Sequence, residues 1–166
     1  MDTAEFDAFV SARVPALLRY ARMVSADAHD AEDLVQGALA GAYRNRRKLD
    51  AGSIEPYVRR SVVNAQASRS RRLLRREWVG GSPPEQAAAG GQGNVDDRLW
   101  VVAALRGLPP RQRAVLVLRY LYDLDEAAIA SELGVSRGTV KSQASKALAS
   151  IRASESARRV TEETSR

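Results

Sequence analysis

The sequence of 166 residues contains no cysteine and a single histidine, His29. The lack of cysteine excludes disulfides, thiol nucleophiles and thiolate zinc sites, and it is typical of a cytoplasmic protein. A lone histidine with no second one nearby favours a solvated residue over a metal ligand. We therefore expect neither a metal site nor a cofactor.

Long apolar stretches and catalytic motifs are missing as well. No apolar run approaches the roughly 18 residues that a membrane span needs, so no membrane insertion is expected. The opening MDTAEFDAFV is acidic and lacks the basic start and apolar stretch of a signal peptide. The sequence has no glycine-rich phosphate loop, metal cluster or nucleophile–base pair, which argues against an enzyme and a small-molecule substrate.

Positive charge, in contrast, is abundant and unevenly distributed. The formal net charge is +6, and residues 44–76 hold eleven Arg or Lys against two acids, whereas residues 1–43 carry a net charge of −4. A basic block confined to one stretch is typical of a protein that binds a polyanion. The alternative is a solubilising face, which the scarcity of neighbouring acids disfavours.

Apolar residues recur at helical spacing over residues 6–24, 34–43 and 54–65, and no segment shows the alternation of a strand. Pro15 interrupts the first pattern, which allows either a kinked helix or two shorter ones. Asp30 is placed to cap the second helix. Residues 1–78 therefore predict a small helical domain.

A change in composition separates this domain from a second one. Residues 79–94 are rich in Gly, Pro, Ala and Gln, which predicts a flexible linker. Residues 95–152 predict a second helical domain, and the polar tail at 153–166 can be helical, disordered or regulatory. The predicted fold class is all-α, with two small helical domains joined by a flexible linker.

The second domain contains a helix-turn-helix pattern. Asp125 is expected to cap a helix that ends at Leu133, and Gly134 to terminate that helix in the left-handed conformation. Ser136 is expected to cap the next helix, and Ala130 is small enough for the two helices to cross closely. The alternative is a generic corner between two helices of a bundle.

The second helix of this pattern favours DNA recognition over the generic corner. Polar and basic residues avoid its apolar stripe, namely Ser136, Arg137, Thr139, Lys141, Ser142 and Gln143. The first turns of such a helix contact base edges in the major groove. Arg137 and Gln143 suit guanine and adenine respectively, while Ser136, Thr139 and Lys141 suit phosphates.

Four segments together resemble a bacterial RNA polymerase sigma factor of the extracytoplasmic-function (ECF) group, group IV of the sigma-70 family, with details similar to an actinobacterial subgroup. They are AEDLVQ (31–36), YVRRSVVNA (57–65), LPPRQRAVLVLRY (108–120) and IASELGVSRGTVKSQASKALASIR (129–152). The resemblance covers nearly the whole chain except the linker and the tail. It implies that residues 1–78 are sigma domain two and residues 95–152 are sigma domain four.

The resemblance also implies the partners, which are core RNA polymerase and promoter DNA, with an anti-sigma protein common in the family. The AEDLVQ helix would dock on the polymerase clamp helices through Glu32, Asp33 and Gln36, and the LVLRYL segment (116–121) would contact the flap. The downstream promoter element would be read and melted by a segment that contains Tyr57, Arg60, Asn64, Arg69, Arg71 and Arg72. For Tyr57 a place in the core is the alternative.

Two glycines, Gly37 and Gly41, lie four residues apart on the helix that follows Asp30. Each costs roughly 1 kcal/mol of helix propensity relative to alanine. Such spacing allows the close approach of another helix. The two alternatives are that the approaching helix belongs to the same domain or that it belongs to an external partner.

The sequence therefore predicts a cytoplasmic sigma factor that directs core polymerase to specific promoters in response to stress or the environment. The alternative is a free-standing helix-turn-helix regulator that binds duplex DNA alone. The AEDLVQ motif favours the sigma factor, because a repressor has no use for it. A helical adaptor that never touches DNA is disfavoured by the basic block.

Overall fold

The computed structural model describes residues 1–25, 28–80 and 96–164, and throughout these ranges the regular structure is helical. The helices are α1 (Thr3–Val24), α2 (Ala28–Asn45), the short 3₁₀ helix η1 (Arg46–Lys48), α3 (Ile54–Gly80), α4 (Asp96–Arg106), α5 (Pro110–Tyr120), α6 (Glu126–Leu133) and α7 (Arg137–Thr164). The all-α prediction is confirmed. Of the linker predicted at 79–94, the first two residues end α3 and the others lie outside the described residues.

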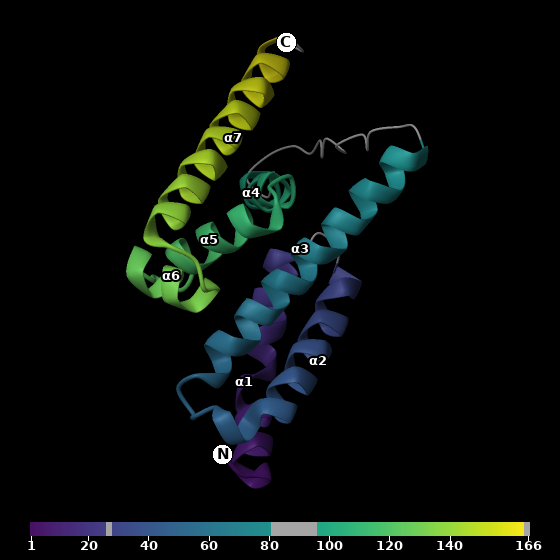
Figure 1. Ribbon diagram of the computed structural model, residues 1–166. Helices are drawn as coiled ribbons and strands as arrows, with labels where there is room; N and C mark the ends of the chain where they lie inside the picture. Colours follow the sequence, from purple (N-terminus) through teal and green to yellow (C-terminus); the bar gives the residue numbers. More distant parts are fainter. Residues whose placement is uncertain (26–27, 81–95, 165–166) are drawn as a thin grey trace.

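Helices α1, α2 and α3 pack side by side as the first helical group (Figure 1). Asp2 starts α1 with a capping box, since its carboxylate accepts a hydrogen bond from the Glu5 backbone amide and the Glu5 carboxylate accepts one from the Asp2 backbone amide, both at 2.8 Å. Pro15 lies inside α1, which continues as one helix rather than two. Tertiary packing of Leu17 and Tyr20, both fully buried beyond the proline, supports the helix across it.

The start of α2 differs from the prediction. The helix begins at Ala28, so Asp30 lies in its first turn and is not its cap. A carboxylate in the first turn is still favourable because it faces the positive end of the helix dipole. Asp30 also accepts a hydrogen bond of 2.6 Å from Arg69 of α3.

Helices α4 to α7 form the second helical group, and its helix-turn-helix is capped as predicted. Asp125 accepts a hydrogen bond from the Ala128 amide at 2.7 Å, and Ser136 accepts one from the Thr139 amide at 3.1 Å. Gly134 has φ 65° and ψ 41° and its amide closes the end of α6. The local capping rules therefore fix both ends of the turn.

Helix α7 is longer than the predicted domain. It runs for 28 residues to Thr164, so the part of the tail that the structure describes is helical. Arg158 stacks over the Trp100 ring at 5.7 Å and thereby connects this extension to α4. None of the helices in the described ranges is both long enough and apolar enough to span a membrane.

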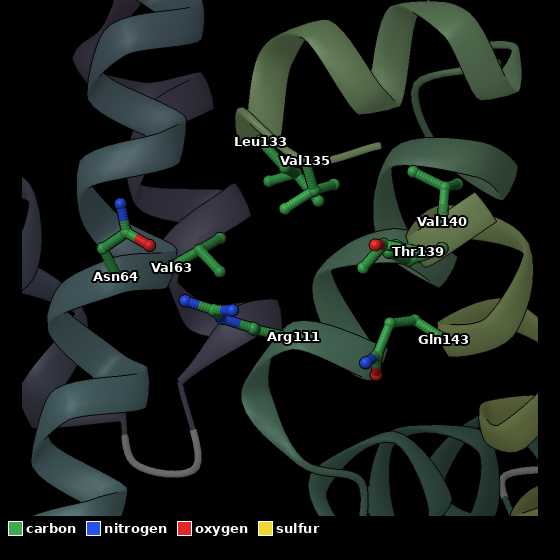
Figure 2. A pocket seen from close by; sticks show the side chains of 9 residues that line it. Val63, Asn64, Arg111, Leu133, Val135, Thr139, Val140 and Gln143 are labelled. Atoms are coloured by element: carbon green, nitrogen blue, oxygen red, sulfur yellow. The ribbon is translucent and has the colours of Figure 1, made fainter. Parts of the chain in front are cut away.

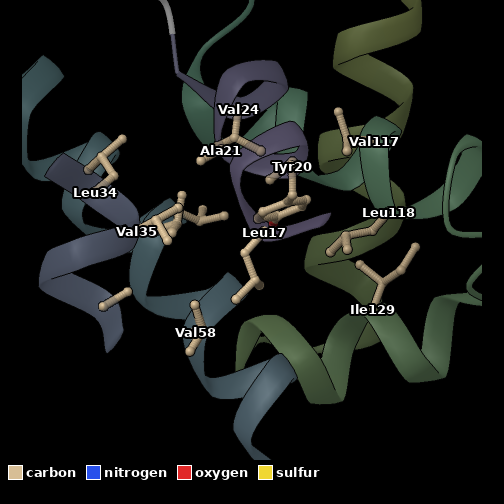
Figure 3. Packing of buried hydrophobic residues seen from close by; sticks show 14 of the residues in the cluster. Leu17, Tyr20, Ala21, Val24, Leu34, Val35, Val58, Val117, Leu118 and Ile129 are labelled. Atoms are coloured by element: carbon tan, nitrogen blue, oxygen red, sulfur yellow. The ribbon is translucent and has the colours of Figure 1, made fainter. Parts of the chain in front are cut away.

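The two helical groups share one hydrophobic core (Figure 3). Leu17, Tyr20 and Val58 of the first group belong to the same buried cluster as Leu118 and Ile129 of the second. All five are no more than 1% exposed. The groups are thus packed against each other and do not merely follow one another along the chain.

The two glycines of α2 have different surroundings. A Cβ at Gly37 would meet nothing within 4 Å, whereas a Cβ at Gly41 would lie 3.4 Å from the Tyr57 hydroxyl of α3. Gly41 therefore serves packing within the first helical group. Gly37 faces open space on the exposed side of α2.

Gly37→Ala is expected to raise the free energy of unfolding by about 0.5–1 kcal/mol, because alanine removes the entropic cost of a helical glycine without a clash. Urea denaturation followed by circular dichroism measures the change. Gly41→Ala is the matched control, and it should gain less because of Tyr57. An equal or larger gain at Gly41 would contradict the packing described above.

Candidate nucleic-acid interface

The first two turns of α7 carry most of the residues that were predicted to contact DNA. Arg137, Lys141 and Ser142 are exposed. Ser136 and Thr139 hold the helix start together, since their hydroxyl oxygens are 2.9 Å apart in addition to the capping bond. The free amides and the dipole of this helix start favour an anion such as a phosphate. The exposed turn therefore combines phosphate affinity with a side chain that can read guanine.

Lys141 has an acidic neighbour within the same helical group. Its ammonium lies 3.9 Å from Glu126, which is also 3.8 Å from Arg119. The Lys141 side chain is 68% exposed, and an ion pair this long and this exposed contributes little. Lys141 thus remains available to a phosphate.

Thr139 and Gln143 are less exposed than Arg137 because they point toward α3. Figure 2 shows Asn64 and Val63 of α3 opposite Thr139 and Gln143 of α7, across a small cavity that Arg111 also lines. The cavity measures about 20 Å³, which holds one water molecule and no base. Asn64 and Gln143 were predicted to read two different promoter elements, and they line opposite sides of this one cavity.

The α3 arginines that were predicted to contact DNA differ in their surroundings. Arg71 and Arg72 are exposed, and Arg71 donates to the Ser68 hydroxyl at 3.2 Å. Arg69 instead bridges to α2, at 2.6 Å from Asp30 and 3.8 Å from Asp33.

Arg60 reaches the second helical group. A Cβ built on Gly134 would come within 2.6 Å of the Arg60 guanidinium, so this guanidinium lies directly over the helix-turn-helix glycine.

Tyr57 is partly buried against the hydrophobic core, which was the alternative to a DNA contact. The ring packs against the hydrophobic core, and its hydroxyl accepts a hydrogen bond from the Asn45 amide at 3.2 Å. In this arrangement Tyr57 joins α2 to α3.

The residues predicted to dock on polymerase form an exposed acidic face of α2. Glu32 and Asp33 are 63% and 70% exposed, and Gln36 is exposed beside them. The LVLRYL segment is divided: its first three residues are buried in the core, and only Tyr120 and Leu121 are largely exposed.

The burial of three charged side chains, Arg59, Arg113 and Glu132, was not predicted from the sequence. Arg59 of α3 donates two hydrogen bonds to Glu132 of α6, at 2.5 and 2.8 Å, and the two side chains are only 10% and 6% exposed. Arg113 of α5 is buried and bonds three backbone carbonyls. Glu132 lies three residues after Ile129 and therefore on the buried side of α6. This spacing is the one sequence signal that could have indicated its burial.

Burial and pairing shift the pKa values of these groups. Burial opposes the charge of Arg59, but the hydrogen bond and charge of Glu132 outweigh it and raise its pKa. Burial raises the pKa of Glu132 against the opposing effect of Arg59. Burial, helped by the nearby Arg106, lowers the pKa of Arg113 to about 10, so Arg113 stays protonated at neutral pH.

Comparisons with known proteins agree with this architecture. Residues 9–77 match the model for Sigma-70 region 2, and residues 98–151 match that for Sigma-70, region 4. The chain is 36% identical over 156 residues to the RNA polymerase sigma-E factor of Streptomyces coelicolor, which covers 91% of this chain and 86% of the relative. It is 32% identical over 154 residues to the ECF RNA polymerase sigma factor SigM of Mycobacterium tuberculosis, and this match covers 90% of this chain and 76% of SigM.

Solved structures show the same fold. The sigma factor RpoE from Bartonella quintana, determined in complex with the anti-sigma factor NepR, superposes with a TM-score of 0.68 at 25% identity over 91% of this chain and 96% of that one. CnrH in complex with the cytosolic domain of CnrY superposes with a TM-score of 0.62 at 22% identity, over 94% of this chain and 90% of CnrH. The chain belongs to the ECF RNA polymerase sigma factors, and the family resemblance predicted from its sequence is confirmed.

Proposed function

We propose that this chain is the promoter-specificity subunit of a bacterial RNA polymerase, with residues 1–78 as domain two and residues 95–152 as domain four. One observation supports this most directly. A single chain presents an exposed acidic face on α2 and two separate polar or basic surfaces, on α3 and on the first turn of α7. A polymerase-docking face together with two DNA-contacting surfaces is what a promoter-selecting subunit requires.

Each surface then has one role. Glu32, Asp33 and Gln36 bind the polymerase clamp helices, and the exposed Tyr120 and Leu121 contribute to flap binding. Domain four reads the upstream promoter element through Ser136, Arg137, Thr139, Lys141, Ser142 and Gln143. Domain two reads and melts the downstream element through Arg60, Asn64, Arg71 and Arg72, with Arg69 and Tyr57 positioned by α2.

The role is not catalytic, since the polymerase supplies the chemistry, and it places the protein in the cytoplasm with its polymerase. RpoE of Bartonella quintana is bound by an anti-sigma factor in its solved structure. We propose an inhibitor of that class as a partner of this chain, and stress or an environmental change as the signal that releases it.

Run-off transcription with purified core polymerase on a library of genomic fragments tests this function. We expect the chain to co-migrate with core polymerase and to start transcription at a small, defined set of promoters. A chain that binds one duplex tightly by itself and adds no start-site selection would instead be the free-standing regulator. Failure to bind core polymerase would contradict the proposal outright.

Arg137→Ala is expected to weaken binding to the upstream element by about 1–3 kcal/mol and to relax the preference at one base position, because the guanidinium pairs with one guanine. Competition between promoter variants in the run-off assay measures both effects. Lys141→Ala is the matched control: it also removes one positive charge, but it should weaken all variants uniformly. If Arg137→Ala instead weakened binding to all promoter variants equally, Arg137 would contact a phosphate and not a base.

A further inference from the structure

An exposed aromatic side chain lies among basic residues where α2 ends. Tyr43 of α2 is 39% exposed, and the guanidinium carbon of Arg46 in η1 lies 4.0 Å from the centroid of its ring. Phe6 of α1 meets the same ring edge-on, with 5.3 Å between the ring centroids. Phe6, Tyr43 and Arg46 therefore form a column that begins in the hydrophobic core and ends at the surface, and we call it the stacking column.

Several contacts hold the stacking column in place. Arg46 donates a hydrogen bond of 3.0 Å to the carbonyl of Tyr43, and the Arg46 carbonyl accepts one of 3.4 Å from the N-terminal ammonium of Met1. Phe6, at the inner end, is only 5% exposed. A ring and a guanidinium that are already ordered lose little conformational freedom when a ligand stacks on them.

The residues next to the stacking column are positively charged. Arg44, Arg47 and Lys48 are exposed, and within the described part of the chain none of the three is paired with a carboxylate. The carboxylates of Asp2 and Glu5, at the start of α1, instead accept hydrogen bonds from backbone amides of their own turn. The surroundings therefore suit a ligand that combines a flat ring with negative charge.

The stacking column lies apart from the surfaces assigned above. Figure 1 shows the start of α1 and the end of α2 at one tip of the first helical group, away from α4 to α7. A short connection joins this tip to Ile54, the first residue of α3, and Ile54 and Asn64 are separated by about 15 Å along the helix. A ligand of the column is therefore distinct from the DNA that Asn64 and the arginines after it would contact.

We propose that the stacking column binds an unpaired base of single-stranded DNA. The base stacks on the outer side of the Arg46 guanidinium, and Arg47 and Lys48 contact the flanking phosphates. Bases stack on arginine planes as well as on aromatic rings, and such stacking accepts any base. The column also supplies domain two with an exposed aromatic group, since Tyr57 packs against the core.

The inference rests on the proposed function, because an opened promoter is where unpaired bases occur. In that setting the column holds one base of the separated strand independently of its sequence. It acts beyond the segment that α3 reads, so it contributes to keeping the strands apart and not to promoter choice.

The test uses the full-length chain and a short single-stranded oligonucleotide of thymidines that carries one 2-aminopurine, whose fluorescence is quenched when the base stacks. A second oligonucleotide of equal length has abasic sites throughout, so it offers the same phosphates without bases. Arg46→Lys keeps the charge of the column and removes its planar group. Arg47→Lys is the matched control, because it makes the same change at the neighbouring exposed residue.

We expect Arg46→Lys to bind the oligonucleotide with bases about five- to tenfold more weakly than the parent and to lose the quenching. Arg47→Lys should change this affinity by less than about twofold and keep the quenching, because a phosphate pairs with either cation. Both variants should bind the abasic oligonucleotide as the parent does. Tyr43→Leu should match Arg46→Lys, since its guanidinium has no ring beneath it, whereas Tyr43→Phe should match the parent.

Three results would overturn the inference: a parent chain that does not quench 2-aminopurine, equal losses for Arg46→Lys and Arg47→Lys, or undiminished quenching in Tyr43→Leu. The oligonucleotide assay needs no polymerase, so its outcome is separable from that of run-off transcription. A chain that stacks the base through Arg46 but starts no transcription with core polymerase would refute the proposed function and leave the binding site standing. A chain that is active in run-off transcription but binds both oligonucleotides equally would refute the site alone.

Discussion

Replacing Arg113 with alanine is expected to lower the free energy of unfolding by about 3–5 kcal/mol. The guanidinium donates to three backbone carbonyls, those of Val24 at 2.7 Å and of Arg106 and Leu108 at 2.8 Å each. Each buried carbonyl left without a donor costs about 1–3 kcal/mol, and water recovers part of that sum at Arg106, which is only partly buried. The variant thus detaches the end of α1 and the α4–α5 turn from α5 together.

Urea denaturation measures this loss, and two variants control it. Arg113→Lys keeps the charge, but a single ammonium cannot reach three carbonyls with the fork geometry of a guanidinium, so most of the loss should persist. Arg111→Ala removes an exposed arginine two residues away and should change the stability by no more than about 0.5 kcal/mol. A loss below about 1 kcal/mol for Arg113→Ala would show that other groups satisfy the carbonyls.

The sequence predicted those features of the fold that depend on neighbouring residues. Asp125, Gly134 and Ser136 cap their helices as expected, because a capping bond spans only three or four positions. Apolar periodicity likewise located the helices of the first group. The start of α2 was predicted three residues too late, since a carboxylate in the first turn and a carboxylate at the cap produce nearly the same pattern.

The features that the sequence did not predict depend on distant contacts. Arg59 and Glu132 are 73 positions apart, and Arg113 reaches Val24 across 89 positions. Nothing in the local sequence distinguishes a buried arginine from the exposed Arg71 or Arg72. The arrangement of the two helical groups therefore emerges only from the folded chain.

In the candidate site, too, the features that depend on neighbouring residues could be predicted and those that depend on distant contacts could not. The exposed turn with Arg137 and Lys141 could be predicted, because polar residues that avoid an apolar stripe must face outward. The bridge from Arg69 to Asp30 and the packing of Tyr57 on Gly41 could not, since each depends on how α3 lies against α2. The DNA-binding expectation for Tyr57 rested on the family resemblance, and that for Arg69 rested also on its place in the basic block at 44–76.

Gly134→Val is expected to lower the free energy of unfolding by about 2–4 kcal/mol. At φ 65° an L-residue costs about 1–2 kcal/mol, and a β-branched one is particularly unfavourable there. The added Cβ would also come within 2.6 Å of the Arg60 guanidinium, and displacing a packed group typically costs about 1–3 kcal/mol, here at the low end because Arg60 is a flexible side chain. Urea denaturation again measures the change.

Gly138→Val is the matched control, since a Cβ there would have its nearest neighbour at 3.7 Å and the residue lies in the first turn of α7. It should be close to neutral. Adding Arg60→Ala to Gly134→Val separates the two costs: the strain at φ 65° remains, while about 0.5–1 kcal/mol of the loss is recovered because contacting residues are coupled. Arg60 of α3 lies over Gly134 of the helix-turn-helix only while the two helical groups are packed together, so strictly additive losses would show that the free chain does not keep its two helical groups together.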